Sequence, residues 1–182
     1  MNTAPPATAV QETTLVVTAS HPAPPTLPMR QLKAIRAKCL DCTGWTPKGV
    51  RHCPFDGVHS HPCPLWPFRF GCSPATASRR HGKEFLSPEH LPGAGMRMAE
   101  PSTTKFPTQQ LKAIRLYCLE CCGGKSKIVK YCTLDGINST PCGLWLFRFR
   151  CSPATARRRY GEEMVTPGQL PGADVLIESL PP

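Results

Sequence analysis

Apolar side chains recur at helical spacing in two segments of the chain. In residues 29–42 the stripe falls at i, i+3, i+7 and i+10, and its last two positions are Cys39 and Cys42. Residues 108–121 repeat this stripe, and Thr108 can serve as its N-cap. The spacing therefore predicts two helices, each of which carries a C-x2-C pair of thiols into the protein interior.

A second pair of helices is predicted by capping residues. The dipeptides at 73–74 and 152–153 place a serine at the N-cap and a proline at the first helical position, where each residue is favoured. Between the two helices of each copy, an Asp-Gly dipeptide and short apolar runs predict a turn between extended segments, as in a β-hairpin. Helices combined with a hairpin indicate a small α+β fold.

These patterns belong to a tandem duplication. Both copies space five cysteines as C-x2-C-x10-C-x9-C-x8-C, and they agree at 38 of 64 aligned positions. We therefore divide the chain into module 1 (residues 30–94) and module 2 (residues 108–173), joined by a linker (residues 95–107) that we expect to be flexible. Residues 1–29 contain six prolines and no apolar periodicity, which predicts a disordered leader, and residues 174–182 form an acidic tail.

Modules of this size need more than a hydrophobic core. They bury little apolar surface, and such small domains are usually stabilised by disulfides, a metal ion or a partner. The chain has eleven cysteines, and its first 29 residues lack the basic start and the apolar run of a secretory signal. No stretch is apolar enough to span a membrane. We therefore expect a cytoplasmic protein whose thiols stay reduced and bind metal.

The repeat also selects the type of metal ligand. Module 2 contains no histidine, so a site common to both modules consists of cysteines alone. Four cysteines in a tetrahedron, two of them from a C-x2-C pair, are typical of structural zinc sites, although four thiolates also suit an iron–sulfur cluster. We predict one Zn²⁺ per module and two per chain. The predicted ligands are Cys39, Cys42, Cys53 and Cys63 in module 1 and Cys118, Cys121, Cys132 and Cys142 in module 2.

The fourth ligand of each site has two candidates. Each module has a fifth cysteine, Cys72 in module 1 and Cys151 in module 2. We favour Cys63 and Cys142 over these because each begins an aromatic segment that can turn back towards the C-x2-C pair. The fifth cysteine is then interpreted as a small buried apolar residue.

The cysteine motif has a parallel in known sequences. LKAIRAKCLDC, followed by a CP…CPLWPFRFG segment, resembles a small cysteine motif of uncharacterised bacterial proteins, many of them encoded by phages or prophages. The four matching cysteines are the predicted ligands of each module. The resemblance covers roughly half of each module, and it implies a zinc-binding protein that belongs to a mobile element.

The charge of the chain indicates an anionic partner. The formal net charge is +10, which becomes +6 if eight thiolates bind two Zn²⁺, and each module has ten Lys and Arg against four Asp and Glu. Such a surface attracts a polyanion, and repeated or clustered arginines are candidates for contacts with nucleic acid. These candidates are Arg69, Arg79 and Arg80 in module 1 and Arg148, Arg157, Arg158 and Arg159 in module 2.

The clustered arginines and the aromatic segments can each also have a purely structural role. Arg80 with Glu84, and Arg159 with Glu163, are spaced i, i+4 and can pair on a solvated helix face. The repeated segment of aromatic residues around Arg69 can stack on bases, but in so small a module the same rings are favoured as core.

We interpret the chain as two zinc-stabilised modules that bind nucleic acid bivalently, because a short linker raises the local concentration of the second module. We expect this to serve a phage or another mobile element. The alternative is an adaptor that binds a host or phage protein, with zinc purely structural. Neither an enzyme nor a small-molecule substrate is expected, because no Ser/His/Asp set, phosphate loop or carboxylate pair occurs in both copies.

Overall fold

The computed structural model describes most of both modules and part of the linker. The described residues are 27, 30–91, 95–98, 100, 105–137 and 139–171. The predicted acidic tail and, apart from Leu27, the predicted leader lie outside the described residues.

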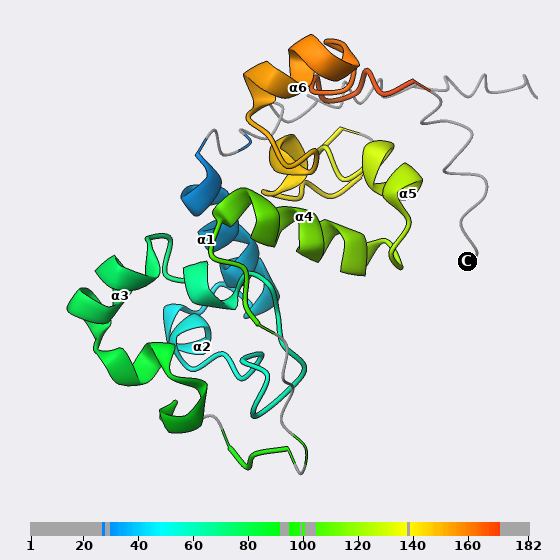
Figure 1. Cartoon of the computed structure of the whole chain (residues 1–182). Helices are drawn as coiled ribbons and strands as arrows, with labels where there is room; N and C mark the ends of the chain where they lie inside the picture. The colour runs from blue at the N-terminus through cyan, green and yellow to red at the C-terminus, as the bar shows by residue number, and fades with distance from the viewer. Residues whose placement is uncertain are drawn as a thin grey trace, which may run out of the picture.

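Both modules consist of short helices joined by loops (Figure 1). Module 1 contains α1 (Gln31–Cys42), α2 (Pro47–Arg51) and α3 (Pro74–His81), with the 3-10 helices η1 (Trp66–Phe68), η2 (Lys83–Leu86) and η3 (Pro88–His90). Module 2 contains α4 (Gln110–Cys121), α5 (Ser126–Lys130), η4 (Trp145–Phe147) and α6 (Pro153–Tyr160). Among the described residues, no helix has the length and apolar character needed to cross a membrane.

The helices predicted from periodicity and from capping are confirmed. Ile35 of α1 and Ile114 of α4 are fully buried, and each helix ends at the second cysteine of its C-x2-C pair. Ser73 caps α3 by accepting a hydrogen bond from a backbone N–H three residues later at 3.3 Å, and Ser152 caps α6 in the same way. The Thr108 prediction is wrong, because the N-cap of α4 is the next residue, whose side chain makes no capping bond.

The expectation of an α+β fold is wrong. Throughout the residues that the structure describes, there is no β-strand. The Asp56 carboxylate accepts hydrogen bonds from the backbone N–H groups of Val58 and His59 at 2.9 and 2.8 Å, so these groups are not free for a hairpin ladder. A backbone bond from Cys63 N–H to Phe55 O at 3.0 Å closes the loop instead. The Asp-Gly turn therefore forms a compact loop held by a side chain.

The two modules share one hydrophobic core. α1 packs against α4, and buried side chains of both modules form one continuous cluster. Figure 1 shows these two helices crossing in the middle of the molecule, with α2 and α3 on one side and α5 and α6 on the other. Phe106 of the linker stacks on Trp66 with ring centroids 5.5 Å apart, and Met98 N–H donates to Val58 O at 2.7 Å. Two described residues of the linker thus contact module 1, and the shared core corrects the expectation of modules held together only by a flexible linker.

Replacing Ile114 by Ala should destabilise both modules, because this side chain lies in the shared cluster. We expect the free energy of unfolding to fall by about 2–5 kcal/mol. In a Trp145→Phe background both remaining tryptophans belong to module 1, so denaturant unfolding followed by fluorescence reports on the module without the Ile114 substitution. Ile128→Ala, at an exposed position of α5, should change stability by less than about 0.5 kcal/mol. A module 1 transition that does not move would contradict the shared core.

Candidate metal centres and basic surfaces

The four predicted ligands of module 1 line one small cavity. Cys39 and Cys42 come from the last turn of α1, Cys53 from the loop after α2, and Cys63 from the loop before η1. The cavity has a volume of about 40 Å³, and most of its other lining is apolar. Cys72 does not take part in this lining. The structure therefore brings Cys63, and not the fifth cysteine, to the other three thiols.

Module 2 repeats this arrangement. Its cavity has a volume of about 30 Å³ and is lined by Cys118, Cys121, Cys132 and Cys142. Cys122 joins the lining at the position that Thr43 occupies in module 1. Tyr117 of α4 lines both cavities, so module 2 completes the wall of the module 1 cavity. The packing of α1 on α4 thus shapes the thiol sites as well as the core.

The thiols surround each cavity without converging on one point. Within the part of the chain that the structure describes, no three His, Cys, Asp or Glu side chains form a group tight enough to hold a metal ion. All eleven cysteines are free thiols. Neutral thiols do not attract one another, whereas a cation draws thiolates inward to a tetrahedron. Each set of four thiols therefore suits one ion in donor type and number, but its sulfurs must move closer together to bind it.

Burial and crowding make these thiols hard to ionise without a cation. The pKa of Cys39 is raised to about 12, first by burial and then by the nearby Cys63, Cys53 and Cys42. Burial followed by the same crowding raises the pKa of Cys118 to about 12 in module 2. Four groups that oppose one another's negative charge form a site that a divalent cation stabilises strongly.

The backbone around each cavity favours a cation held by thiolates. Burial raises the pKa of the third and fourth thiols, and a backbone N–H two residues further on donates to each sulfur and lowers the pKa. The first two thiols lie at the C-terminal ends of α1 and α4. A helix dipole is negative at this end and attracts positive charge. Sulfur charge and helix dipole therefore both favour a cation in the cavity.

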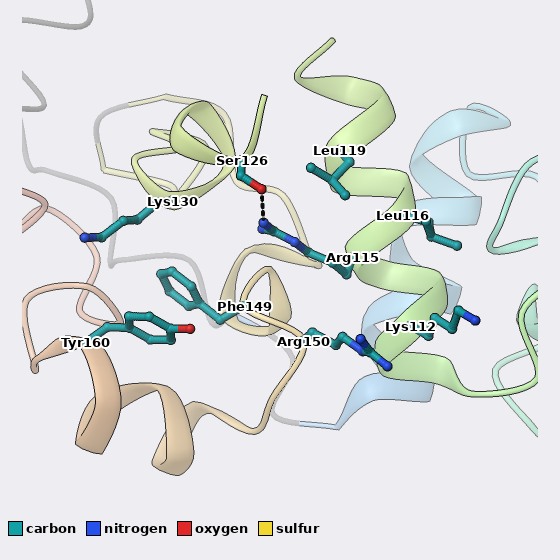
Figure 2. Close-up of a pocket in the computed structure, with 9 residues that line it drawn as sticks. All are labelled: Lys112, Arg115, Leu116, Leu119, Ser126, Lys130, Phe149, Arg150 and Tyr160. Carbon is teal, nitrogen blue, oxygen red and sulfur yellow. Dashed lines mark hydrogen bonds between the residues drawn. The ribbon is translucent and has the colours of Figure 1, made fainter. Parts of the chain in front are cut away.

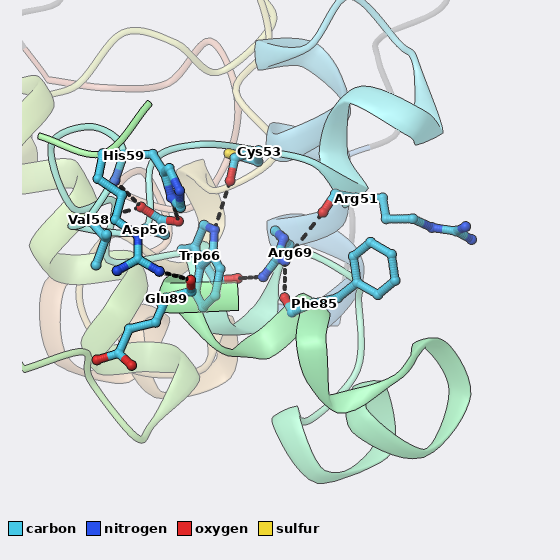
Figure 3. Close-up of polar contacts among 10 residues, drawn as sticks. Arg51, Cys53, Asp56, Val58, His59, Trp66, Arg69, Phe85 and Glu89 are labelled. Atoms are coloured by element: carbon cyan, nitrogen blue, oxygen red, sulfur yellow. Dashed lines mark hydrogen bonds and ion pairs between the residues drawn. The ribbon is translucent and has the colours of Figure 1, made fainter. Parts of the chain in front are cut away.

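Each module also buries one arginine beside its thiols. In module 1 the Arg69 side chain is fully buried, and each of its three nitrogens donates to a backbone carbonyl; Figure 3 draws the contacts with Arg51, Trp66 and Phe85. Burial lowers its pKa to about 10, whereas the nearby cysteine sulfurs favour its charged form. Its Nε donates to Val50 O at 3.1 Å, Nη1 to Trp66 O at 3.0 Å, and Nη2 to Arg51 O at 3.4 Å and to Phe85 O.

Arg148 plays the same part in module 2. It donates to Lys130 O at 3.3 Å, to Trp145 O at 2.9 Å and to Met164 O at 2.6 Å, and it lines the thiol cavity. Neither this side chain nor that of Arg69 reaches the surface. The expectation that these two arginines contact nucleic acid therefore does not hold, because both serve the interior of their modules.

The aromatic segments belong to the same interior. Trp66 Nε1 donates to the backbone oxygen of Cys53 at 3.0 Å, and Trp145 Nε1 donates to that of Cys132 at 2.7 Å. Both indoles are buried. Each tryptophan therefore fixes the loop that carries the third cysteine of its module.

The other predicted arginines are exposed. Figure 1 places α3, with the pair at 79–80, and α6, with the triplet at 157–159, at the outer edges of the two modules. The anticipated i, i+4 ion pairs do not form within the described ranges. On α6, Arg157 Nε pairs instead with Glu162 at 2.5 Å, and among the described residues the next two arginines of this helix have no carboxylate partner. These helices therefore present positive charge that the described part of the protein does not neutralise.

We expect Arg148→Lys to destabilise the protein despite the conserved charge. Lysine cannot reproduce the planar fork that satisfies three backbone carbonyls, and buried acceptors without donors cost about 1–3 kcal/mol each. The free energy of unfolding should fall by at least about 3 kcal/mol in urea denaturation. Arg158→Lys, at an exposed position of α6, is the matched control and should be neutral within about 0.5 kcal/mol. Equal stability of the two variants would show that the buried fork is dispensable.

No protein-family model, curated protein or solved structure matches this chain.

Proposed function

We propose that the protein binds two structural Zn²⁺ ions, one in each four-thiol cavity, and uses the exposed arginines around them to bind nucleic acid. The observation that carries the metal assignment is that, in each module, the four equivalent cysteines from three separate segments line one small cavity, which in module 2 also includes Cys122. Zinc is favoured because the donors are all thiols, with no histidine or carboxylate in either lining. Four protein ligands leave no coordination position for a substrate, which supports a structural role.

The buried arginine supports this assignment on electrostatic grounds. A Zn²⁺ ion with four thiolates carries two net negative charges, and neighbouring cations and N–H donors stabilise such a centre. Arg148 lines the cavity of module 2, and Arg69 is electrostatically coupled to Cys53 and Cys39 in module 1. One guanidinium per site therefore balances one of the two net negative charges of the zinc centre.

Nucleic acid is the partner that the surface supports best. The exposed arginines of α3 and α6 lie on two outer edges of one molecule, and phosphates bind such unneutralised charge. Free thiols are typical of a reducing compartment, so we place the protein in the cytoplasm. The resemblance of its cysteine motif to phage-encoded sequences supports a role as an accessory factor of a phage or another mobile element.

Metal analysis tests the centres directly. The purified chain should contain two zinc atoms, and chelation should abolish its helical circular dichroism, because in each module the metal would join the helix of the C-x2-C pair to two separate loops. Cys63→Ser and Cys142→Ser should each reduce the zinc content to one atom. Cys72→Ser, the matched control, should retain two. Iron with acid-labile sulfide in the native protein, or a fold that survives with no metal, would falsify the assignment.

Salt-dependent binding tests the surface. Replacing Arg158 and Arg159 together by Ala should weaken binding to a labelled oligonucleotide and reduce the slope of log affinity against log salt by about 1.5, since two phosphate contacts are lost. Replacing Lys48 and Lys105 removes the same charge at exposed positions outside α3 and α6 and should have a smaller effect. The adaptor alternative would be established instead if the native protein bound no nucleic acid at low salt, and if a pull-down treated with nuclease recovered one partner protein in stoichiometric amount.

A further inference from the structure

A second cavity of module 2 lies away from the thiols and is strongly basic. It has a volume of about 490 Å³ and opens between α4, α5 and the C-terminal end of α6. Its lining contains no carboxylate. The cations that line it are Lys112 and Arg115 of α4, Lys130 of α5 and Arg150 of the turn after η4. In Figure 2, Arg115 and Arg150 lie between Lys130 at one end and Lys112 at the other.

One of these cations is held in place by neutral partners. Arg115 donates through Nη1 to Arg148 O at 3.0 Å and through Nη2 to the Ser126 hydroxyl oxygen at 2.7 Å. No ion pair involves Arg115 within the described ranges. Its guanidinium is therefore oriented without being neutralised, which is the arrangement that suits an anionic ligand.

An aromatic stack forms one wall of the same cavity. The Arg148 guanidinium lies 4.3 Å from the Phe149 ring centroid, and Tyr160 stacks on Phe149 with centroids 4.5 Å apart and an angle of 21°. Tyr160 is the outer ring of this stack and is 40% exposed. Its hydroxyl points towards Arg115 and Arg150 in Figure 2. A flat, half-exposed ring beside fixed cations can stack on a nucleobase while the cations hold the adjacent phosphate.

Arg150 stands at a backbone position that favours glycine. Its φ is 63°, and module 1 has Gly71 at the corresponding position with φ of 74°. The turn itself is the same, because Arg150 N–H donates to Phe147 O at 3.0 Å and Gly71 N–H donates to Phe68 O at 2.9 Å. A left-handed conformation is unfavourable for arginine and is found where the surrounding structure or function requires it. Here the strained residue is one of the cations of the cavity.

We propose that this cavity binds a segment of single-stranded nucleic acid, with one phosphodiester at Arg115 and Arg150, the flanking phosphates towards the lysines at the two ends, and the neighbouring base stacked on Tyr160. The proposal rests on nucleic-acid binding by the whole protein and assigns its single-strand site to module 2. Module 1 differs at two of these positions. Gly71 stands where module 2 has Arg150, so one cation is missing, and His81 stands where module 2 has Tyr160 and stacks on Phe70.

The test compares two probes with equal numbers of phosphates, using the full-length, zinc-loaded protein and fluorescence anisotropy. One probe is a labelled oligothymidylate, and the other is the same strand with abasic residues. The native protein should bind the first about fivefold more tightly or better, because stacking contributes only when a base is present. Tyr160→Ala should remove this preference, whereas Tyr160→His, the residue of module 1, should retain part of it.

Arg150→Gly tests the phosphate contact. It should weaken binding to both probes equally and reduce the salt slope by about 0.7, the value for one phosphate contact on a single strand. Stability should not fall, because glycine already serves the same turn in module 1. Lys127→Ala removes one exposed charge from α5 outside the cavity lining and should have a smaller effect on affinity and slope.

The outcomes separate this proposal from the more general one. If the native protein binds neither probe at low salt, the single-strand site is rejected; if it also binds no duplex, nucleic-acid binding is rejected with it. If it binds, but Arg150→Gly matches Lys127→Ala and Tyr160→Ala keeps the preference for bases, nucleic-acid binding stands and the assignment to this cavity is overturned.

Discussion

A buried guanidinium is the interaction on which each module depends. Burying a charged group is costly unless its hydrogen bonds are satisfied, and this fold satisfies Arg69 with carbonyls from the end of α2, from η1 and from η2. These segments are distant in sequence, and the structure describes no sheet that could join them. The hydrogen bonds of one side chain therefore join segments that strand pairing would join in an α+β domain. The tryptophan three residues earlier lies flat against the guanidinium, with its ring centroid 4.0 Å away, and holds the loop of the third cysteine.

The same arginine links the interior to the thiols. Its charge is disfavoured by burial and favoured by the nearby sulfurs, so a buried cation and an ionised thiol site stabilise each other. The corresponding groups recur in module 2, where Arg148 lies in the lining of the cavity. Loss of the arginine thus removes both a hydrogen-bond centre and the positive charge that balances the site. This explains why an arginine between aromatic residues is present in both copies, although it never reaches the surface.

The sequence allows the local elements and the thiol sets to be predicted, but not the role of this arginine. α1 and α4 follow from apolar periodicity, and α3 and α6 from a serine–proline cap, because these signals lie within a few residues of each other. In each module the four predicted cysteines line one cavity, since a C-x2-C pair and the repeat restrict the choice, whereas nothing in the sequence indicates that Cys122 joins them in module 2. The hairpin failed because the Asp56 carboxylate competes for the backbone N–H groups. Periodicity cannot reveal that Arg69 is buried, because its partners, such as Phe85 O, lie too far along the chain.

Because of the shared core, the two modules cannot search for a ligand independently of each other. A flexible linker lets a second module search for its ligand, and the advantage depends on linker length. Here α1 packs on α4, Tyr117 lines both thiol cavities, and Phe106 of the linker stacks on Trp66 of module 1. The positions of α3 and α6 are thereby fixed relative to each other, so a nucleic acid that contacts both must match their spacing. Under the proposed function, differences between the copies, such as Arg150 in place of Gly71, would let the two modules contact different parts of the same nucleic acid.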